Sequence, residues 1–267
     1  MFQVEEFKNG YCVIGDSTDQ EIIDYVKKRE NNVQLIVCDP PYGNIVRDSW
    51  DRSKQTQKEF ADWMIDWTKR WSAALERDAA LYVWGGIGIP EFRPYIEYLS
   101  RIEVESDLKM ANLITWKKRR AYGVQHNYLF TREECAYLFN GTDIKKPRVF
   151  NVPYLEEERG YEAFNKKYPA KSRFKRRSNV WSDITELFSG KVHVAQKPKK
   201  LYETLINIHT NEGETILDMF AGSGTCAFAA IDCNRRFIII ENDYDTARAT
   251  IDRIREYERQ RTKEHND

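Results

Sequence analysis

The stretch Asp39-Pro40-Pro41-Tyr42 combines residue types that suit chemistry on a planar exocyclic amine. The apolar run at residues 35–38 predicts a short buried strand that delivers Asp39 to the rim of a sheet. Each proline fixes its own φ angle and restricts the residue before it, so the backbone after Asp39 is stiff before any ligand arrives. Tyr42 then offers a flat ring. Taken alone, the stretch is equally typical of an ordinary turn.

A second stretch predicts a nucleoside pocket. Residues 215–218 and 237–240 favour strands, and between them a glycine-containing turn at 220–225 leads into a helix whose start is residues 226–233. Glycine lets the backbone approach a ligand where a β-carbon would collide, and Glu241 is placed to accept hydrogen bonds from ribose hydroxyls. The spacing from the turn to this acidic residue is shorter than in nicotinamide-binding folds.

Strands and helices alternate around these two stretches. Residues 11–14 predict the first strand, a helix capped at Thr18 or Asp19 follows, and the strand at 35–38 comes next. This strand–helix–strand unit predicts a parallel pair. The next predicted elements are a polar loop at 44–55 and a helix at 60–75, whose Trp residues recur at the spacing of a buried helix face. A strand at 79–84 and a helix that begins near Pro90 follow. The last of these elements are strands at 112–116 and 135–139, with residues 140–141 ending the second strand, and a helix that begins at Pro198.

Length and composition indicate one α/β domain with an inserted segment, because 267 residues can bury one substantial core. Residues 140–190 are the predicted insertion, since they lack a long periodic run and mix acidic, basic and proline residues. Hydrophobic residues make up 41% and charged residues 31%, no apolar run reaches membrane-spanning length, and residues 1–10 lack a signal-peptide pattern. These features predict a cytoplasmic protein.

Cysteine and histidine usage argues for neither disulfides nor a metal. The five cysteines are scattered, mostly within apolar stretches, and form no CxxC pair, so buried free thiols are expected. None of the four histidines stands at metal-ligand spacing to another His or Cys, so no metal is predicted.

Charge is informative through its distribution, because 42 basic residues balance 42 acidic ones. Basic residues cluster at 117–120 and 171–177 with aromatic residues close by, and Lys197, Lys199 and Lys200 form a third cluster. One such cluster is more often a solvated face, but three in one chain favour a nucleic-acid partner.

Together these motifs resemble those of the DNA amino-methyltransferases, S-adenosylmethionine-dependent enzymes that methylate the exocyclic nitrogen of adenine or cytosine. Their cofactor signature, Asp-x-Phe-x-Gly-x-Gly-Thr, matches residues 218–225, and their catalytic Asp/Ser/Asn-Pro-Pro-Tyr/Phe matches residues 39–42. The catalytic motif comes first, which is the permuted order of the beta subgroup, and residues 193–198 resemble that subgroup's His-Pro-x-Gln-Lys-Pro. Val194 and Met219 replace common prolines, two departures that affect loop shape but remove no side-chain chemistry.

The resemblance implies a Rossmann-like S-adenosylmethionine-dependent methyltransferase fold: a mixed, mostly parallel sheet with helices on both faces and a circularly permuted motif order. Residues 1–139 and 191–267 would form the catalytic domain, and residues 140–190 the target-recognition segment. Double-stranded DNA is the implied partner. A homodimer, to which the Trp-rich helix could present an apolar face, and a partner restriction enzyme are both left open.

By the same resemblance, the carboxylate of Asp39 and the carbonyl of Pro40 accept the two N–H groups of the target amine and localise its lone pair toward the methyl donor. Tyr42 stacks on the flipped base. An aspartate at the first position favours N6 of adenine; N4 of cytosine is the alternative. An RNA or protein-amide substrate, and a DNA-recognition subunit that binds cofactor without turnover, are further alternatives.

Further side chains receive roles from the resemblance. Asp16 would bind the adenine amine of the cofactor, Lys197 its methionine carboxylate and Glu241 its ribose, while the acidic run at 156–158 would face away from the DNA. The implied cofactor set is Asp16, Ser17, Lys197, Asp218, Phe220, Ala221, Gly222, Ser223, Gly224, Thr225, Glu241 and Asn242. The implied catalytic set is Asp39, Pro40, Pro41 and Tyr42, and the DNA-contact set is Lys117, Lys118, Arg119, Arg173, Lys175, Arg176 and Arg177.

Overall fold

The structure, a computed structural model, describes residues 2–42, 56–87, 93–123, 125–158, 172–186 and 196–264. Its strands are β1 Gln3–Phe7, β2 Gly10–Ile14, β3 Val33–Cys38, β4 Leu75–Gly85, β5 Lys109–Tyr122, β6 Phe130–Phe139, β7 Tyr154–Glu158, β8 Phe174–Arg176, β9 Val180–Trp181, β10 Thr215–Asp218 and β11 Arg236–Glu241. Its helices are α1 Gln20–Glu30, α2 Gln57–Ser72, α3 Arg93–Glu105, α4 Lys199–His209, α5 Thr225–Asp232 and α6 Tyr244–Glu264.

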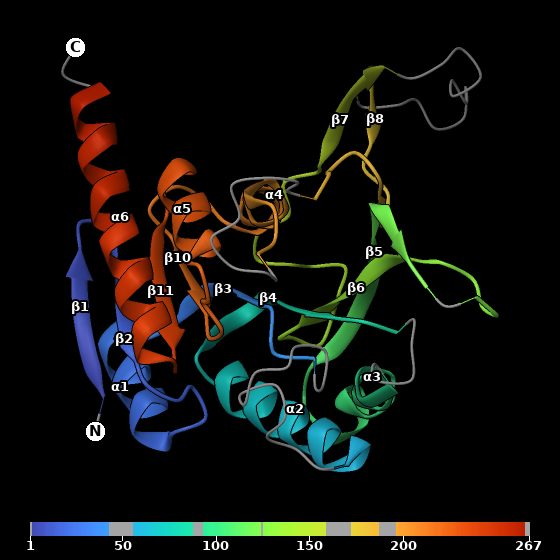
Figure 1. The fold of residues 1–267 in the computed structure, drawn as a ribbon, viewed down its shortest axis with the longest axis horizontal. Coiled ribbons are helices and arrows are strands. Elements are labelled where there is room, and N and C mark those ends of the chain that lie inside the picture. Colours follow the sequence, from blue (N-terminus) through green and yellow to red (C-terminus); the bar gives the residue numbers. More distant parts are fainter. Residues whose placement is uncertain are drawn as a thin grey trace.

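A nine-stranded sheet forms the centre of the molecule, in the order β1-β2-β11-β10-β3-β4-β6-β5-β9 (Figure 1). The strands from β2 to β4 in that order run parallel. β1 is antiparallel to β2, β6 is antiparallel to β4 and β5, and β9 is parallel to β5. The sheet is therefore mixed and mostly parallel, as predicted.

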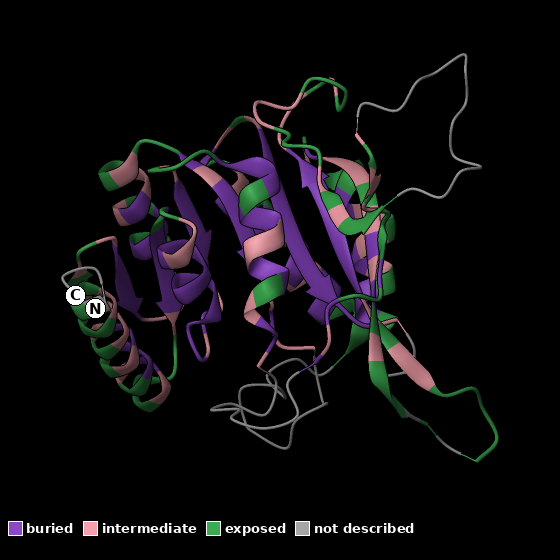
Figure 2. Cartoon of the chain, turned by 90° about the horizontal axis from the view of Figure 1, so that it is seen from above, coloured by how far each residue is buried: buried purple, intermediate pink, exposed green. Residues whose placement is uncertain are grey.

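Helices cover both faces of this sheet, which explains why the middle of each central strand is apolar. In β3, Leu35 and Val37 contribute to one half of the core, and Ile36 and Cys38 to the other. Residues of α4, α5 and α6 complete the first half, and residues of α1, α2 and α3 the second. The buried sheet between the two helix layers is visible in Figure 2. The predicted fold class is confirmed.

Acidic residues gather at one edge of the sheet. Asp16 follows β2, Asp39 follows β3, β10 ends at Asp218 and β11 at Glu241. Because these four strands are neighbours and parallel, their carboxyl ends meet at the same edge. Ligands of open α/β sheets bind outside this edge.

The arrangement differs from the sequence-based expectations in several elements. β2 and β3 share a direction but do not pair, because β11 and β10 lie between them. β1 precedes the strand predicted to be first, α2 ends at Ser72 so that Leu75 opens β4, and β5 and β6 are longer than predicted. The long C-terminal helix α6 was not predicted. Trp67 and Trp71 of α2 are fully buried, which confirms their predicted core role.

The segment at 140–190 contains more regular structure than its sequence suggests. β7 and β8 form a separate antiparallel hairpin, and β9 joins the main sheet beside β5. Trp181 and Ile184 are buried in the main core, so this part of the segment packs with the main sheet. The predicted loop at 44–55, the helix entry near Pro90 and residues 193–195 lie outside the described residues.

Two further observations concern the chain as a whole. All five cysteines are unpaired thiols; four are buried and Cys233 is half-buried, which agrees with the prediction. Across the described ranges, no helix combines the length and apolar character needed to span a bilayer.

Candidate active site and cofactor pocket

Asp39 lies directly after β3 in a largely buried cluster of charged and polar side chains. Its Oδ1 atom accepts a hydrogen bond from the Tyr42 hydroxyl at 2.9 Å and lies 2.5 Å from the Lys197 Nζ atom. Lys197, directly before α4, also donates to the Tyr42 hydroxyl at 2.9 Å. The two motifs at 39–42 and 193–198 therefore meet at one carboxylate oxygen.

Glu133, on β6, is a member of this cluster that sequence reasoning missed. Its Oε2 atom lies 3.2 Å from Lys197 Nζ and 3.4 Å from the Tyr42 hydroxyl, and its Oε1 atom accepts from Lys118 of β5. The one sequence signal was a pair of glutamates directly before an apolar strand. Lys118, which the sequence predicts to contact DNA, contacts Glu133 in this structure.

Burial and ion pairing set the protonation states in the cluster. Burial raises the pKa of Asp39, although the Lys197 ammonium opposes the rise. Burial also disfavours ionised Glu133, but the ammonium groups of Lys197 and Lys118 outweigh it and hold its pKa at about 2. Burial disfavours charged Lys197, yet the two carboxylates raise its pKa. Burial and the neighbouring carboxylates raise the pKa of Tyr42 far above its usual range.

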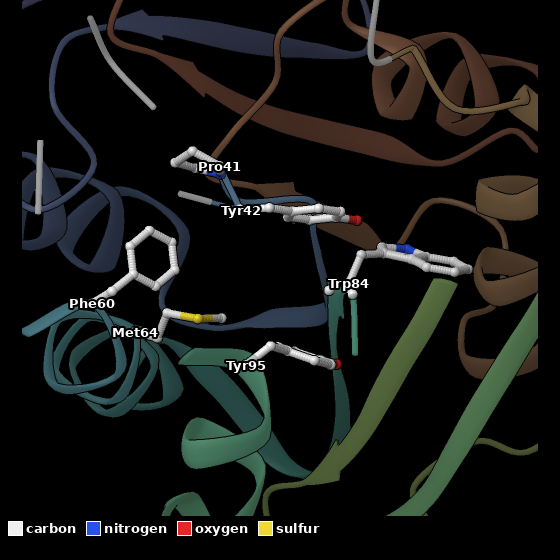
Figure 3. Close-up of a pocket in the computed structure, with 8 residues that line it drawn as sticks. Pro41, Tyr42, Phe60, Met64, Trp84 and Tyr95 are labelled. Carbon is white, nitrogen blue, oxygen red and sulfur yellow. The ribbon is translucent and has the colours of Figure 1, made fainter. Parts of the chain in front are cut away.

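A small apolar hollow adjoins this cluster. The rings of Tyr42 and Tyr95 lie on opposite sides of it in Figure 3, an arrangement suited to a flat ligand. The Tyr95 hydroxyl is held by Val83 O at 2.7 Å and Ala136 N at 3.0 Å, so the ring is fixed. The hollow is lined by Pro41, Tyr42, Phe60, Met64, Trp84, Gly85, Gly86 and Tyr95.

The glycine turn after β10 lies beside β11. The Gly222 N–H donates to Glu241 Oε2 at 2.7 Å, and the other oxygen of Glu241 accepts the Asp243 N–H at 2.9 Å. Gly222 and Gly224 have φ angles of +47° and +73°, a region that favours glycine. Because a β-carbon at Gly222 would meet nothing within 4 Å, the turn leaves open space above its backbone.

Other members of the predicted cofactor set stand around this turn. Phe220 packs against Trp67 with ring centroids 5.2 Å apart, and its N–H donates to Asp218, whose pKa burial raises to about 8. Ser223 Oγ and Thr225 Oγ1 are 3.1 Å apart. Ala221 is buried, and Asn242 is exposed.

Asp16 is tied to the same edge, because the neighbouring Gly15 N–H donates to the Glu241 carbonyl at 2.9 Å. Asp16 Oδ1 accepts the N–H and hydroxyl of Thr18, at 2.8 and 2.7 Å, which is a local turn. Ser17 is buried and its carbonyl accepts Trp71 Nε1–H at 2.8 Å. Asp19 occupies the N-cap position of α1 without a side-chain cap bond.

The basic residues predicted to contact DNA divide into two groups. In the β7–β8 hairpin and the residues after it, Lys175 pairs with Glu157, Arg173 with Glu158 at 3.5 Å and Arg177 with Asp183 at 2.7 Å. The acidic run therefore does not turn away from the basic cluster; it partly neutralises it. Lys117 and Arg119, on the exposed β5–β6 arm, and Arg176, which lies 5.9 Å from the Phe150 ring, are exposed.

Comparison with known proteins decides the family. The model of the N6/N4 methyltransferases, described as DNA methylase, matches residues 33–252. The chain belongs to the N6/N4 DNA methylase family. This family uses S-adenosylmethionine, and the open glycine turn beside a fixed carboxylate fits such a nucleoside cofactor.

Individual relatives match most of the chain. It is 29% identical over 226 residues to the Type II methyltransferase M.HpaI of Haemophilus parainfluenzae, covering 79% of this chain and 65% of that protein. It is 28% identical to the Type II methyltransferase M1.MboII of Moraxella bovis, covering 80% and 86%.

Two solved structures share the fold. The M1.HpyAVI-SAM complex aligns with a TM-score of 0.63 at 21% identity, covering 91% of this chain and 98% of that one. The cytosine-N4-specific PvuII DNA methyltransferase aligns with a TM-score of 0.66 at 18% identity, covering 91% and 85%.

Proposed function

We propose that this protein is a site-specific DNA methyltransferase of the beta subgroup that transfers a methyl group from S-adenosylmethionine to N6 of a flipped adenine. One observation carries the proposal: Tyr42, whose hydroxyl is hydrogen-bonded to Asp39, lines an apolar hollow at the same sheet edge as the open glycine turn. An acceptor for an amine, a flat slot for a base and a nucleoside cradle are therefore neighbours.

The chain's own residues would prepare the amine for reaction. Asp39 Oδ and the Pro40 carbonyl accept its two N–H groups, which favours a tetrahedral nitrogen with a localised lone pair. When bound, S-adenosylmethionine supplies the electrophilic sulfonium methyl. Fixed acceptors act as electrostatic preorganisation, and alignment of two reactants contributes roughly 7–11 kcal/mol. Stacking on Tyr42, worth about 1–3 kcal/mol, offsets part of the cost of flipping the base.

For the cofactor, Gly222 and Gly224 provide close backbone approach, Glu241 the ribose acceptor, Asp16 the partner of the adenine amine and Phe220 an apolar wall. The predicted role of Lys197 at the methionine carboxylate stays a prediction. Its ammonium contacts Asp39 here, so such a role would require the side chain to move.

Adenine is proposed over cytosine because an aspartate opens the catalytic motif, which is the family's common choice for N6. A relative, YhdJ of Escherichia coli, is named a DNA adenine methyltransferase, whereas the PvuII enzyme is named cytosine-N4-specific. Cytosine N4 is therefore the second candidate. The names of M.HpaI and M1.MboII as Type II methyltransferases support a partner restriction enzyme; a homodimer stays a prediction.

For contact with duplex DNA we propose two elements with unequal roles. Residues 117–132, the β5–β6 arm, contain five basic residues and no acidic ones. The arm projects from the body in Figure 2, with Tyr128 and Leu129 90% and 63% exposed at its tip. Residues 140–190 remain the proposed target-recognition segment, but Arg173, Lys175 and Arg177 are ion-paired and add less to phosphate binding.

Nucleoside mass spectrometry tests the activity. Unmethylated duplex DNA of diverse sequence is incubated with S-adenosylmethionine and either the protein or its Asp39→Ala variant. N6-methyladenine formed only by the unaltered protein is the expected result. N4-methylcytosine would keep the mechanism and overturn the choice of base. Bound cofactor without any methylated base would refute DNA methylation and direct the search to RNA, a protein amide or a subunit without turnover.

A further inference from the structure

The Lys197 ammonium is saturated by oxygens of the catalytic cluster. It lies 2.5 Å from Asp39 Oδ1, 2.9 Å from the Tyr42 hydroxyl and 3.2 Å from Glu133 Oε2. An ammonium has three N–H groups, so each can face one of these oxygens. The Lys197 side chain is 5% exposed, which leaves water little access to it.

This arrangement competes with the target amine. Asp39 Oδ1 receives the Lys197 ammonium and the Tyr42 hydroxyl at once, so an amine that donates to this oxygen must displace a donor. An ammonium withdrawn from one buried carboxylate needs another partner, because an unpaired buried charge is costly. Within the described ranges, Glu133 is the other carboxylate that Lys197 contacts.

Glu133 is itself held by a second lysine, through the carboxylate oxygen that does not face Lys197. Its Oε1 atom binds Lys118, whose Nζ atom also lies 5.3 Å from the centre of the Trp116 ring on the same strand. Glu133 thus bridges two ammonium groups. It keeps one oxygen fixed by Lys118 while the other faces Lys197.

We propose that Glu133 is a positioning residue that shares the Lys197 ammonium with Asp39 and takes it over when the target amine binds to Asp39. The inference rests on the proposed methyltransferase function. No bond is made or broken in this step; one ion pair weakens while its neighbour strengthens. In the absence of DNA, the shared ammonium neutralises the carboxylate that would otherwise stand unpaired.

The proposal predicts opposite effects of the two partners on Asp39. Burial raises the pKa of Asp39, the Lys197 charge lowers it, and the Glu133 charge raises it. Removing Lys197 therefore raises that pKa, and removing the Glu133 charge lowers it. The ionisable groups that face Asp39 from the surrounding elements are Lys197, Glu133, Tyr42, Cys38, Cys135, Tyr202 and Asp218.

Kinetics of Glu133→Gln and Lys197→Met provide the first test, at saturating DNA and S-adenosylmethionine. For Glu133→Gln, kcat should fall about tenfold, because Lys197 then pairs with Asp39 alone, and the acid limb of the pH profile should move about one unit lower. For Lys197→Met the acid limb of the pH profile should move to higher pH. If Glu133 had a purely structural role, the variants would contain less active protein, but the acid limb of each variant would stay at the pH of the unaltered protein.

A measurement without turnover separates this inference from the function on which it rests. Carboxyl ¹³C NMR of the free protein, assigned with Asp39→Asn, should show the Asp39 midpoint shifting down in Glu133→Gln and up in Lys197→Met. Glu134→Gln is the matched control, since this neighbouring carboxyl bonds Thr115 and should leave the midpoint unchanged. Unchanged midpoints and kcat in Glu133→Gln would overturn the inference, whereas an unaltered protein without methylation would overturn the function.

Lys118→Met keeps the inference testable if Glu133→Gln fails to fold. This variant leaves Glu133 with Lys197 alone and draws the ammonium away from Asp39, so the Asp39 midpoint should rise. A midpoint equal to that of the unaltered protein would contradict the sharing of Lys197 between the two carboxylates.

Discussion

The Gly222 N–H donates to the Glu241 carboxylate at 2.7 Å, which fixes the tip of β11 to the turn after β10. The glycine turn and the acidic residue, recognised separately in the sequence, are thus one structural unit. Glu241 is also held by the Asp243 N–H, so its carboxylate is oriented before a ligand arrives. Such preorganisation reduces the entropy lost on binding.

Gly222→Ala should weaken S-adenosylmethionine binding about tenfold, because the new methyl group would occupy the open space where the cofactor approaches. Its positive φ angle should also cost about 1–2 kcal/mol of stability. Gly213→Ala is the matched control: its φ is +80°, it also has nothing within 4 Å, and it lies in the turn before β10. Calorimetric titration that finds equal affinities for the two variants would contradict the assignment.

Gly224→Ala should lower the free energy of unfolding more than Gly222→Ala or Gly213→Ala does. Gly224 is the N-cap of α5 and has a φ angle of +73°. A β-carbon at this residue would also lie 2.6 Å from Cγ2 of Thr250 in α6. Thr250 is buried and bonded to the Gly222 carbonyl, so it has little room to move. Urea unfolding of the three alanine variants tests this order; a loss at Gly224 no larger than at Gly213 would show that the turn adapts.

Tyr42→Phe and Tyr42→Ala should separate the two properties of this side chain. Phe keeps the ring over the hollow and loses only the hydroxyl shared by Asp39 and Lys197, a loss of about 1 kcal/mol. Ala also loses base stacking, a further cost of about 1–3 kcal/mol. The comparison is made on kcat/KM with duplex DNA. Equal losses in both variants would mean that the hydroxyl, rather than the ring, is what the reaction uses.

The parts of the site that could be predicted lie within local motifs. Asp39 is predicted from the apolar strand before it and the two prolines after it, and Gly222 is predicted from the glycine-containing turn in which it lies. The position of Glu133 could not be read in this way, because it becomes part of the site only when β6 pairs with β4 and brings it to Lys197. The same reason explains why the ion pairing of Arg173 was not predicted: Arg173 meets Glu158 only when β8 pairs with β7.

The order of strands was also beyond local reading. A strand–helix–strand unit predicts that β2 and β3 are parallel, which is correct, but it does not reveal that β10 and β11, encoded far later, insert between them. That insertion places Asp218 beside Asp39 and so joins the two motifs at one edge.

Asp218→Asn should change the pH dependence of stability. Burial raises the pKa of Asp218 to about 8, against about 3.9 in an unfolded chain. Between these values the folded state holds a proton that the unfolded state releases, so this group's contribution to stability falls as pH rises. The amide cannot titrate and can still accept the Phe220 N–H. Urea unfolding across this pH range should show the variant gaining stability over the unaltered protein as pH increases; parallel curves would contradict a buried neutral carboxyl group.

Salt dependence of DNA binding should distinguish the two basic regions. Lys117 and Arg119 lie on an arm without acidic residues, so replacing both with glutamine should remove phosphate contacts and lower the slope of log affinity against log salt by about 0.9 per contact. The matched control replaces Arg173 and Lys175, which already pair with Glu158 and Glu157. This pair of changes removes as much charge, but it should alter the slope less, because these cations are partly neutralised before DNA arrives. Fluorescence anisotropy with a labelled duplex over a salt series gives both slopes. If the control reduces the slope more than the arm variant does, Arg173 and Lys175 leave their glutamate partners when DNA binds. The β7–β8 hairpin would then be the main phosphate contact, as the sequence alone suggested.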